Sequence, residues 1–417
     1  MNPIPYVLPL FLGFSAQKQP LLFQKALSRY PNIIHLQSQA SLSASALSSQ
    51  FMYTVGTGGF LDESIKSQAL DRLHGQGHRL GADWDSDLGF TCLNDSMFGR
   101  PGWGYTVSFG NRFLADASLS DDMLRLALNG NAPYAGTTLN LGPFHADFTA
   151  YQQFQFSFFK SWIKEKYTQQ FGFGLGFVQG NLHRDARANQ WRMTTDSLGS
   201  FVDFQVEQAL FRTSDPNKNA YFFPNGIGAV THFWYQQQWK KHDLYLAVND
   251  LGFIQWNDVS QQARVDTTWR WSGFYFPNIT QVSSTYFSDY ADSLRTGYLR
   301  EEQASYTTLL PVQFFASYRY QWVPEKWGVR AHLAWRPFRQ HLPAAWVSLM
   351  YAPKKWLEGQ FLMGYGGYGS FFTGLDLGFS PGKGWTLALQ TRHLDGLIPT
   401  TFSSGISAGF RVSKHFF

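Results

Sequence analysis

Three groups of residues in this chain have types and spacings that could support chemistry. In the first, one residue separates His145 from Asp147, so a β-strand would place an imidazole and a carboxylate on one face, as acid–base catalysis requires. Spacing of two is common by chance, and no serine lies in a recognisable nucleophile context. We therefore predict that the chain is not an enzyme and has no catalytic residues, with a barrel hydrolase as a disfavoured alternative.

The second group consists of carboxylates that alternate along the chain. Asp83, Asp85 and Asp87 could share one strand face or loop, and Ca²⁺ prefers clustered carboxylate oxygens. The segment lacks the glycine and glutamate of an EF-hand loop, so we favour a hydrated loop or a lumen patch and predict no metal and no cofactor. Cys92 is the only cysteine, which excludes an intramolecular disulfide and a cysteine-based zinc cluster.

The third group is a run of alternating glycines. Gly172, Gly174 and Gly176 are followed by neither a Lys-Ser/Thr pair nor a helical pattern, so they do not resemble a phosphate-binding loop. Glycines in a strand instead allow a bend or a close backbone approach.

The elements that must position these residues are long amphipathic strands. Apolar residues alternate with polar ones over residues 202–207, 263–275, 327–336 and 406–416. Soluble strands centre on about 5–6 residues, whereas a tilted strand that crosses a bilayer needs about 9–11. The face opposite the apolar one carries charges of both signs, which suits a wet interior surrounded by lipid.

Composition supports this architecture and excludes several others. Aromatic residues make up 18% of the 417 residues and charged residues 15%, against about 25% charged in ordinary soluble domains. Such a chain is not disordered, and it has no run of about 18 apolar residues for a membrane helix. The formal net charge of +5 is small and forms no basic block, so we predict no nucleic-acid partner.

The predicted fold class is all-β: a transmembrane antiparallel β-barrel of about fourteen strands. Short helical inserts, suggested by the spacing in residues 61–73 and 120–128, would lie in loops or in an N-terminal plug. Residues 1–16 have the apolar core of a signal peptide, 17–43 form an N-terminal segment that could plug the lumen, and 44–417 form the barrel. This predicts the outer membrane of a Gram-negative bacterium.

Two sets of side chains follow from the barrel. Charged residues on the polar strand faces are candidates for a binding site or ion network in the lumen, and tryptophans beside short polar turns are candidates for an interfacial girdle. The lumen candidates are Arg264, Asp266, Arg270, Asp203, Glu207, Arg330 and Arg336, and the girdle candidates are Trp239, Trp322, Trp327, Trp356 and Trp385.

The run Asn249–Trp256 resembles the "DLGFI-x-W" signature of an uncharacterised family of Bacteroidota outer-membrane β-barrels of unknown function. Residues Asn129, Gly130 and Asn131 resemble that family's "NGN" stretch, and 384–395 with 404–417 resemble its closing hairpin. The resemblance spans about residues 40–417. It implies a fold akin to fatty-acid-transporter barrels and to barrels associated with type IX secretion. We expect a structural role for Asp250, Gly252 and Trp256 within the signature, with ligand contact as the alternative.

The leading functional prediction is a non-enzymatic outer-membrane barrel that passes small apolar molecules or assists envelope secretion. Its partners would be outer-membrane lipid, a small apolar ligand and other envelope or secretion components. The alternatives are a structural or interaction barrel with a plugged lumen inside a larger complex, a barrel hydrolase, and a secreted soluble β-protein with glycan-stacking aromatics.

Overall fold

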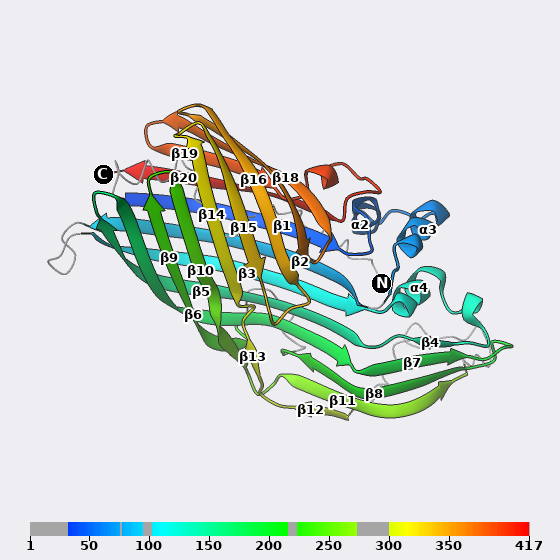
Figure 1. Cartoon of the computed structure of the whole chain (residues 1–417). Coiled ribbons are helices and arrows are strands. Elements are labelled where there is room, and N and C mark those ends of the chain that lie inside the picture. The colour runs from blue at the N-terminus through cyan, green and yellow to red at the C-terminus, as the bar shows by residue number, and fades with distance from the viewer. Residues whose placement is uncertain (1–31, 76, 95–101, 216–222, 273–299, 417) are drawn as a thin grey trace.

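Antiparallel strands close into a ring (Figure 1), and the strand pairings give this ring fourteen members. The computed structural model describes residues 32–75, 77–94, 102–215, 223–272 and 300–416. The last strand pairs with the first, with Phe416 opposite Asn32, so the ring has no free edge. This confirms the predicted fold class. The wall strands, in ring order, are β1 (Asn32–Ala44), β2 (His78–Asn94), β3 (Trp103–Leu119), β5 (Phe144–Ile163), β6 (Tyr167–Ala188), β9 (Gly226–Trp239), β10 (His242–Trp256), β14 (Gln313–Val323), β15 (Trp327–Trp335), β16 (Leu342–Lys354), β17 (Leu357–Gly367), β18 (Phe371–Gly382), β19 (Trp385–Thr391) and β20 (Gly405–Phe416).

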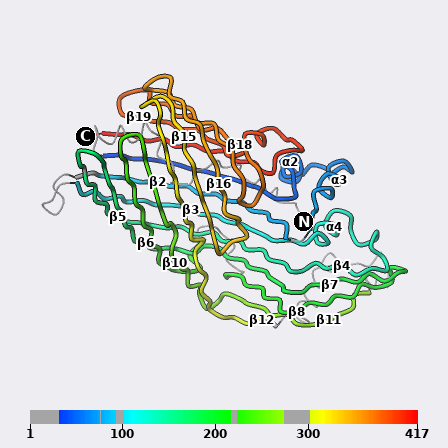
Figure 2. Tube along the Cα trace, in the orientation of Figure 1, coloured from blue at the N-terminus to red at the C-terminus, as the bar shows by residue number. Residues whose placement is uncertain are grey.

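The wall begins earlier in the chain than the sequence suggested. Strand β1 starts at Asn32 and pairs along its length with β2 and β20, so residues 32–43 belong to the wall and not to a plug. Figure 2 shows the blue start and the red end of the chain running side by side. The predicted signal peptide and Phe417 lie outside the described residues.

Five further strands continue the sheet beside the ring and are here called the extension sheet. Its strands run in the order β4–β7–β8–β11–β12, and the end of β6, from Arg184 to Arg187, joins it to the wall by pairing with β8. A short strand, β13, pairs with β10. The bounds are β4 (Thr138–Asn140), β7 (Gln190–Thr195), β8 (Val202–Thr213), β11 (Gln261–Trp271), β12 (Arg300–Gln303) and β13 (Thr307–Leu309).

The two ends of the barrel differ in their connections. At the short-turn end, tight turns join β5 to β6, β9 to β10, β14 to β15, β16 to β17 and β18 to β19. At the long-loop end lie the extension sheet and the helices α2 (Ser49–Gly56), α3 (Glu63–Asp71), α4 (Asp121–Asn129), η2 (Ala132–Tyr134) and η4 (Leu394–Gly396). Helices α3 and α4 confirm the predicted inserts. None of the described helices has the length and apolar character needed to cross a membrane as a helix.

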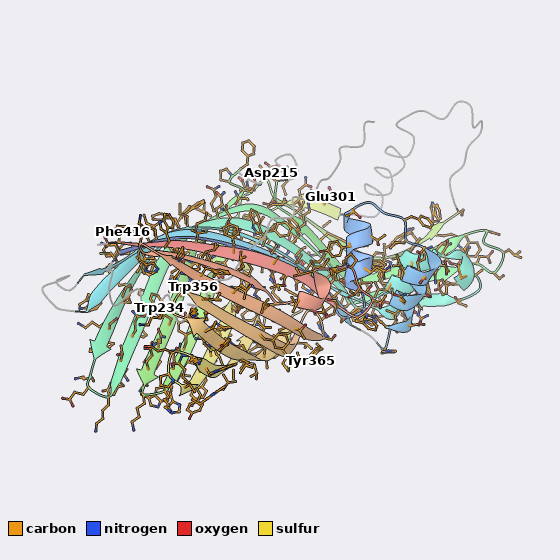
Figure 3. The ribbon with its side chains drawn as sticks, turned by 90° about the horizontal axis from the view of Figure 1, so that it is seen from above. Asp215, Trp234, Glu301, Trp356, Tyr365 and Phe416 are labelled. Carbon is orange, nitrogen blue, oxygen red and sulfur yellow. The ribbon has the colours of Figure 1, made fainter. Side chains whose placement is uncertain are left out.

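The period-two alternation of the sequence sorts side chains between the outside and the lumen. On β15, Leu333 is 48% exposed on the outer face, whereas Arg330 is only 5% exposed in the lumen. The predicted orientation of Val329 and Phe410 away from the centre agrees with this sorting, because Arg330 and Arg411 beside them point inward and are buried. Figure 3 shows outer side chains along the wall, with Trp356 and Tyr365 toward opposite ends of β17. Other exposed members of this belt include Phe109, Phe154, Phe156, Phe171, Leu175, Phe177, Phe253, Phe314, Val347, Leu349, Phe361, Met363 and Leu389.

Candidate functional site in the barrel lumen

The lumen contains a cavity of about 400 Å³, and most of the residues that line it are polar or charged. The inward residues of the wall strands supply these walls, because every second side chain of a strand points to the same side. The charged and polar members include Gln37, Asp85, Asp87, Arg112, Gln153, His232, Asp243, Asp250, Gln313, Arg330, Arg336 and Arg411.

The alternating carboxylates of β2 all take arginine partners. Arg112 Nη2 donates to Asp87 Oδ1 at 2.7 Å, and Arg112 Nε lies 3.7 Å from Asp85 Oδ1. Asp83 accepts from Arg336 Nη1 and from Ser41 Oγ. These three carboxylates therefore form a patch in the lumen in which each has an arginine partner. The sequence favoured such a lumen patch, or a hydrated loop, over a calcium-binding loop.

A short connection between β15 and β16, residues 336–341, folds across the lumen and is here called the cross-lumen loop. Arg339 Nη1 donates to Asp116 Oδ1 at 3.1 Å and also to Asp147 Oδ1. The backbone N–H of Gln340 donates to Asp116 Oδ2 at 2.7 Å, and the Gln340 side chain lies 3.0 Å from His145 Nδ1. The loop is thus held to β3 and β5 by buried, charge-assisted hydrogen bonds.

These contacts cross the whole width of the barrel. Asp83 lies on β2 and Arg336 directly follows β15, and in the ring of fourteen strands β2 and β15 are seven strands apart in either direction. The Arg336–Asp83 ion pair therefore joins opposite walls. Removing one partner of a buried ion pair typically costs about 3–5 kcal/mol, because the remaining charge is stranded. The loop therefore braces opposite walls of the barrel from inside the lumen.

Electrostatics within the loop favour the paired state. Burial alone would lower the pKa of Arg339, but Asp147 and Asp116 raise it well above its ordinary value, so the guanidinium stays charged. Burial, with the nearby Arg336 cation, lowers the pKa of His341 to about 4, so this imidazole is neutral at pH 7. The cations of the loop are therefore its two arginines.

One group within the described residues could offer three ligand atoms to a metal ion. His145, Asp147 and Asp185 each place a ligand atom within 4.8 Å of the other two. His145 Nε2 lies 3.7 Å from Asp185 Oδ1, and His183 Nε2 lies 3.5 Å from Asp147 Oδ2. Both distances are too long for a hydrogen bond.

The charge balance of this group does not favour a metal. Arg187 and Arg212 each donate to Asp185 Oδ2 at 2.7 Å. Arg339 forms ion pairs with both Asp147 and Asp116. Three arginines thus neutralise three carboxylates, and a divalent cation would add buried charge with no counter-ion. We interpret the group as an ion network.

The signature run on β10 forms a β-bulge that reverses which residues face inward. The register with β9 shifts between Val248 and Leu251, and Asp250 adopts a left-handed φ of 54°. Before the bulge, odd-numbered residues such as Ala247 face the lumen, and after it the even-numbered Ile254 does. Asp250 joins the polar cavity, where its charge interacts with Arg112.

Beyond the bulge, the signature supplies the centre of an apolar cluster inside the barrel. Trp256 and Ile254 are fully buried against Tyr151, Tyr306 and Leu310. Trp256 Nε1 donates to Thr308 Oγ1 at 2.9 Å, so the indole also fastens the β13 region to the wall. These contacts agree with a structural role for Trp256, which stays a prediction for the signature.

The lumen candidates predicted from sequence separate into two places. Arg330 and Arg336 are buried in the lumen, as expected. Arg264, Asp266, Arg270, Asp203 and Glu207 are not, because β8 and β11 belong to the extension sheet and not to the ring. Arg270 forms an exposed ion pair with Asp203, and Glu207 accepts from Gln205 on its own strand. Their expected placement in the lumen was therefore wrong.

The same correction applies to the apolar face of β11. Trp269 stacks on Phe204, and Val265 is buried with Val206 and Ala188. This face makes the core of the extension sheet and does not point outward from the barrel.

The remaining predicted residues lie at element ends. Asn129 is the last residue of α4, Gly130 caps it with a φ of 71°, and Asn131 precedes η2. All five girdle candidates lie beside short turns: Trp239, Trp322, Trp327, Trp356 and Trp385. Of these, Trp322, Trp356 and Trp385 are exposed. Their role as a membrane girdle is still a prediction.

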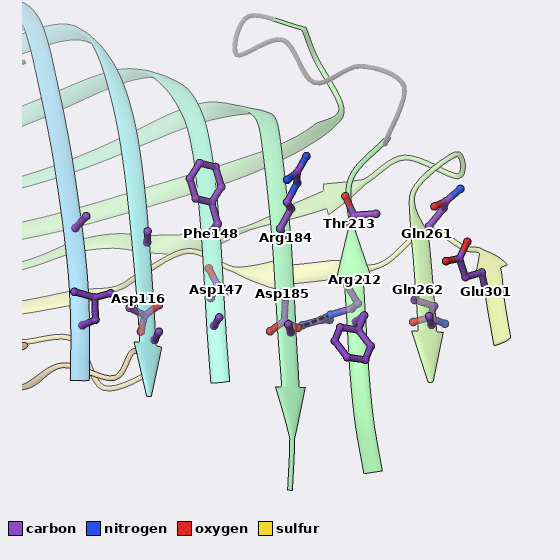
Figure 4. A pocket seen from close by; sticks show the side chains of 18 of the residues that line it. Asp116, Asp147, Phe148, Arg184, Asp185, Arg212, Thr213, Gln261, Gln262 and Glu301 are labelled. Carbon is purple, nitrogen blue, oxygen red and sulfur yellow. Dashed lines mark hydrogen bonds and ion pairs between the residues drawn. The ribbon is translucent and has the colours of Figure 1, made fainter. Parts of the chain in front are cut away.

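A second cavity, of about 680 Å³, lies on the outer side of the wall where the sheet turns into the extension (Figure 4). Its apolar lining comes from outward residues that are mostly small, including Ala82, Ala115, Ala117, Ala146 and Ala186. Figure 4 shows the inward carboxylates Asp116, Asp147 and Asp185 in line on the adjacent strands, with Arg212 reaching Asp185. Only the thickness of the sheet separates this apolar pocket from the ion network.

A closed fourteen-stranded barrel with an apolar outer face and a charged lumen crossed by a loop defines a class: an integral β-barrel of the kind that spans membranes. Within that class, the chain belongs to the "Family of unknown function (DUF5723)", whose model matches residues 24–384. This membership agrees with the predicted resemblance to an uncharacterised family. No curated protein matches the chain in sequence.

Several solved structures are similar in outline. They include the Pseudomonas putida toluene transporter TodX, with 10% identity, 94% of this chain and 92% of that chain covered, and a TM-score of 0.41. A FadL homologue of Pseudomonas aeruginosa has 10% identity, coverage of 93% and 91%, and a TM-score of 0.42. The translocator domain of the Neisseria meningitidis autotransporter NalP has 8% identity, coverage of 94% and 93%, and a TM-score of 0.34. Likeness at this level carries no argument about function, which must come from the geometry of the chain itself.

Proposed function

We propose that this chain is an integral outer-membrane β-barrel of a Gram-negative bacterium that passes small solutes through a lumen gated by the cross-lumen loop. The observation that carries the proposal is the Arg336–Asp83 and Arg339–Asp116/Asp147 bracing of that loop across a polar lumen. The structure then represents the closed state, and passage requires the loop to leave the carboxylates of β2, β3 and β5.

The membrane assignment is supported by the outer belt of large apolar side chains. Soluble monomers rarely expose apolar patches beyond a few hundred Å². Here exposed phenylalanines, leucines and tryptophans occur on strands all around the ring. In membrane barrels the short turns face the periplasm and the long loops face outward. We therefore place the short-turn end in the periplasm.

A test of the membrane assignment is the electrophoretic behaviour of the protein. We expect it in the outer-membrane fraction, with an unheated sample migrating differently from a boiled one in SDS, because a closed barrel resists SDS until heat unfolds it. Recovery as a detergent-free, monodisperse protein from the periplasm would contradict the assignment.

The nature of the solute divides two candidates. Most of the residues that line the lumen cavity are polar or charged, which supports a polar solute in the gated route. The apolar cargo predicted from the sequence is a second candidate, and the 680 Å³ outer pocket with its alanine lining is the observation that favours it. Mass spectrometry of lipid and small molecules extracted with the purified protein separates the two.

The same ion pairs of the cross-lumen loop are also compatible with a barrel that never opens. This is the alternative predicted from the sequence, an interaction barrel with a plugged lumen. An accessory role in envelope secretion, including type IX secretion, rests on the sequence resemblance alone. Stable co-purification of another envelope component, together with a lumen that passes no ionic current, would favour these roles over the gated route.

A further inference from the structure

Among the residues that the structure describes, the exposed lysines gather at one end of the barrel. Six exposed lysines occupy four tight hairpin turns at the short-turn end, and the only acidic residue in these turns is Glu325. The turn between β5 and β6 adds Lys164 and Lys166 around Glu165. We call this set the lysine rim; its members on the four tight turns are Lys240, Lys241, Lys326, Lys354, Lys355 and Lys383.

The opposite end has a different character. Helices α3 and α4 begin with Asp62-Glu63 and Asp121-Asp122, and the one described lysine there is Lys66. Arginines are also absent from the four tight turns, since the described ones lie in the lumen or toward the long-loop end. In the described turns at the short-turn end, eight lysines outnumber two glutamates, so the rim has a net positive field.

Turn formation alone does not explain these lysines. Lys240 and Lys383 both have φ of 50°, a left-handed conformation that glycine or asparagine adopts at lower cost. A turn selected only for its geometry would carry those residues. The backbone geometry of these turns therefore does not by itself select lysine.

Tryptophans stand beside each of the four turns. Trp239 precedes Lys240, Trp327 follows Lys326, Trp356 follows Lys355, and Trp385 comes two residues after Lys383. The ammonium of Lys414 also lies 5.1 Å above the Trp385 ring. Amphipathic rings settle at the level of lipid headgroups, and lysine stems extend along apolar surface to place their charge at the same level.

We propose that the lysine rim binds the headgroups of anionic phospholipids in the membrane leaflet that faces the short-turn end. The inference rests on the proposed function, because it needs the barrel to span a membrane. The rim would fix the depth and tilt of the barrel through its positive charges, while the tryptophans anchor the same level through their rings. Since a basic residue near an anionic surface changes affinity by roughly fivefold, several lysines together make a strong preference.

The test uses the full chain in nanodiscs of equal parts phosphatidylcholine and phosphatidylglycerol, with native mass spectrometry of the lipid released with the protein. The rim variant is Lys241→Gln with Lys326→Gln and Lys355→Gln, which avoids the strained positions. The matched control is Lys66→Gln with Arg192→Gln and Arg264→Gln, which removes three charges from the long-loop end.

We expect the wild type and the control variant to release lipid enriched in phosphatidylglycerol, and the rim variant to release lipid close to the bilayer ratio. High salt should weaken the enrichment, because the Debye length falls to about 3 Å at 1 M. Equal enrichment in the rim and control variants would overturn the inference. So would salt-sensitive binding of a polyglutamate peptide without any lipid enrichment, which would point to an acidic protein partner. Failure of the wild type to enter the nanodisc as a heat-modifiable species would instead contradict the proposed function.

Discussion

Replacing Arg336 and Arg339 together with glutamine should open the lumen to small ions. The change removes the cations from Asp83, Asp116 and Asp147, of which Asp116 is almost completely buried. Each lost pair costs about 3–5 kcal/mol in the closed state, because a carboxylate is stranded without its partner. A loss of even about 3 kcal/mol raises the population of an alternative open state by roughly a hundredfold. Current through planar bilayers that contain the purified protein measures this directly.

The matched control removes two arginines that the sequence also assigned to the lumen. Arg264 and Arg270 are exposed on the extension sheet, so the pair Arg264→Gln and Arg270→Gln should leave the current at the wild-type level. A double loop variant that folds into a heat-modifiable barrel and still passes no current would contradict the gate. The interaction barrel with a plugged lumen would then be the better account.

The contrast between these two pairs of arginines shows what the sequence could and could not specify. Period-two alternation fixes two strand faces for any amphipathic strand. It therefore predicted the inward Arg330 and the outward Leu333 correctly on β15. It does not say what covers the apolar face. On β11 that cover is the stacked Phe204 and the rest of the extension core, and not lipid.

The gate itself was only partly visible in the sequence. Arg336 was singled out because it continues the polar face of its strand, whereas Arg339 lies in a loop with no periodicity. Its partners Asp116 and Asp147 are about two hundred residues away in the chain, and only ring closure brings them together. The sequence also did not point to Arg112. Its role depends on its ion pairs with carboxylates of β2, the neighbouring strand. Contacts of this kind depend on strand order, which one sequence does not reveal.

Substitution of Gly252 by alanine should strongly destabilise the folded barrel. Gly252 follows the bulge of the signature run, and a Cβ built on it would lie 2.1 Å from the carbonyl oxygen of Ala229 and 2.8 Å from Val230 Cα. Both obstacles are backbone atoms of β9, so no side-chain rotation relieves them. Relief requires the β9–β10 ladder to separate, and we expect a loss of more than about 3 kcal/mol. Urea unfolding of the protein in lipid vesicles, followed by the heat-modifiable band, measures the loss.

Gly359 on β17 provides the matched control, because it is another wall glycine with room for a methyl group. A Cβ there would meet only Leu377 Cδ2 at 3.7 Å and Tyr351 O at 3.9 Å, which are ordinary contacts. The Gly359→Ala variant should therefore unfold near the wild-type urea concentration. Its free energy of unfolding should stay within about 1 kcal/mol of the wild-type value, as expected for a tolerated substitution. If Gly252→Ala unfolded at that same urea concentration, the close approach of β9 would not be the reason that the signature has glycine at this position. Its role would then have to be sought in contact with a ligand through the neighbouring Asp250, which lies in the polar cavity.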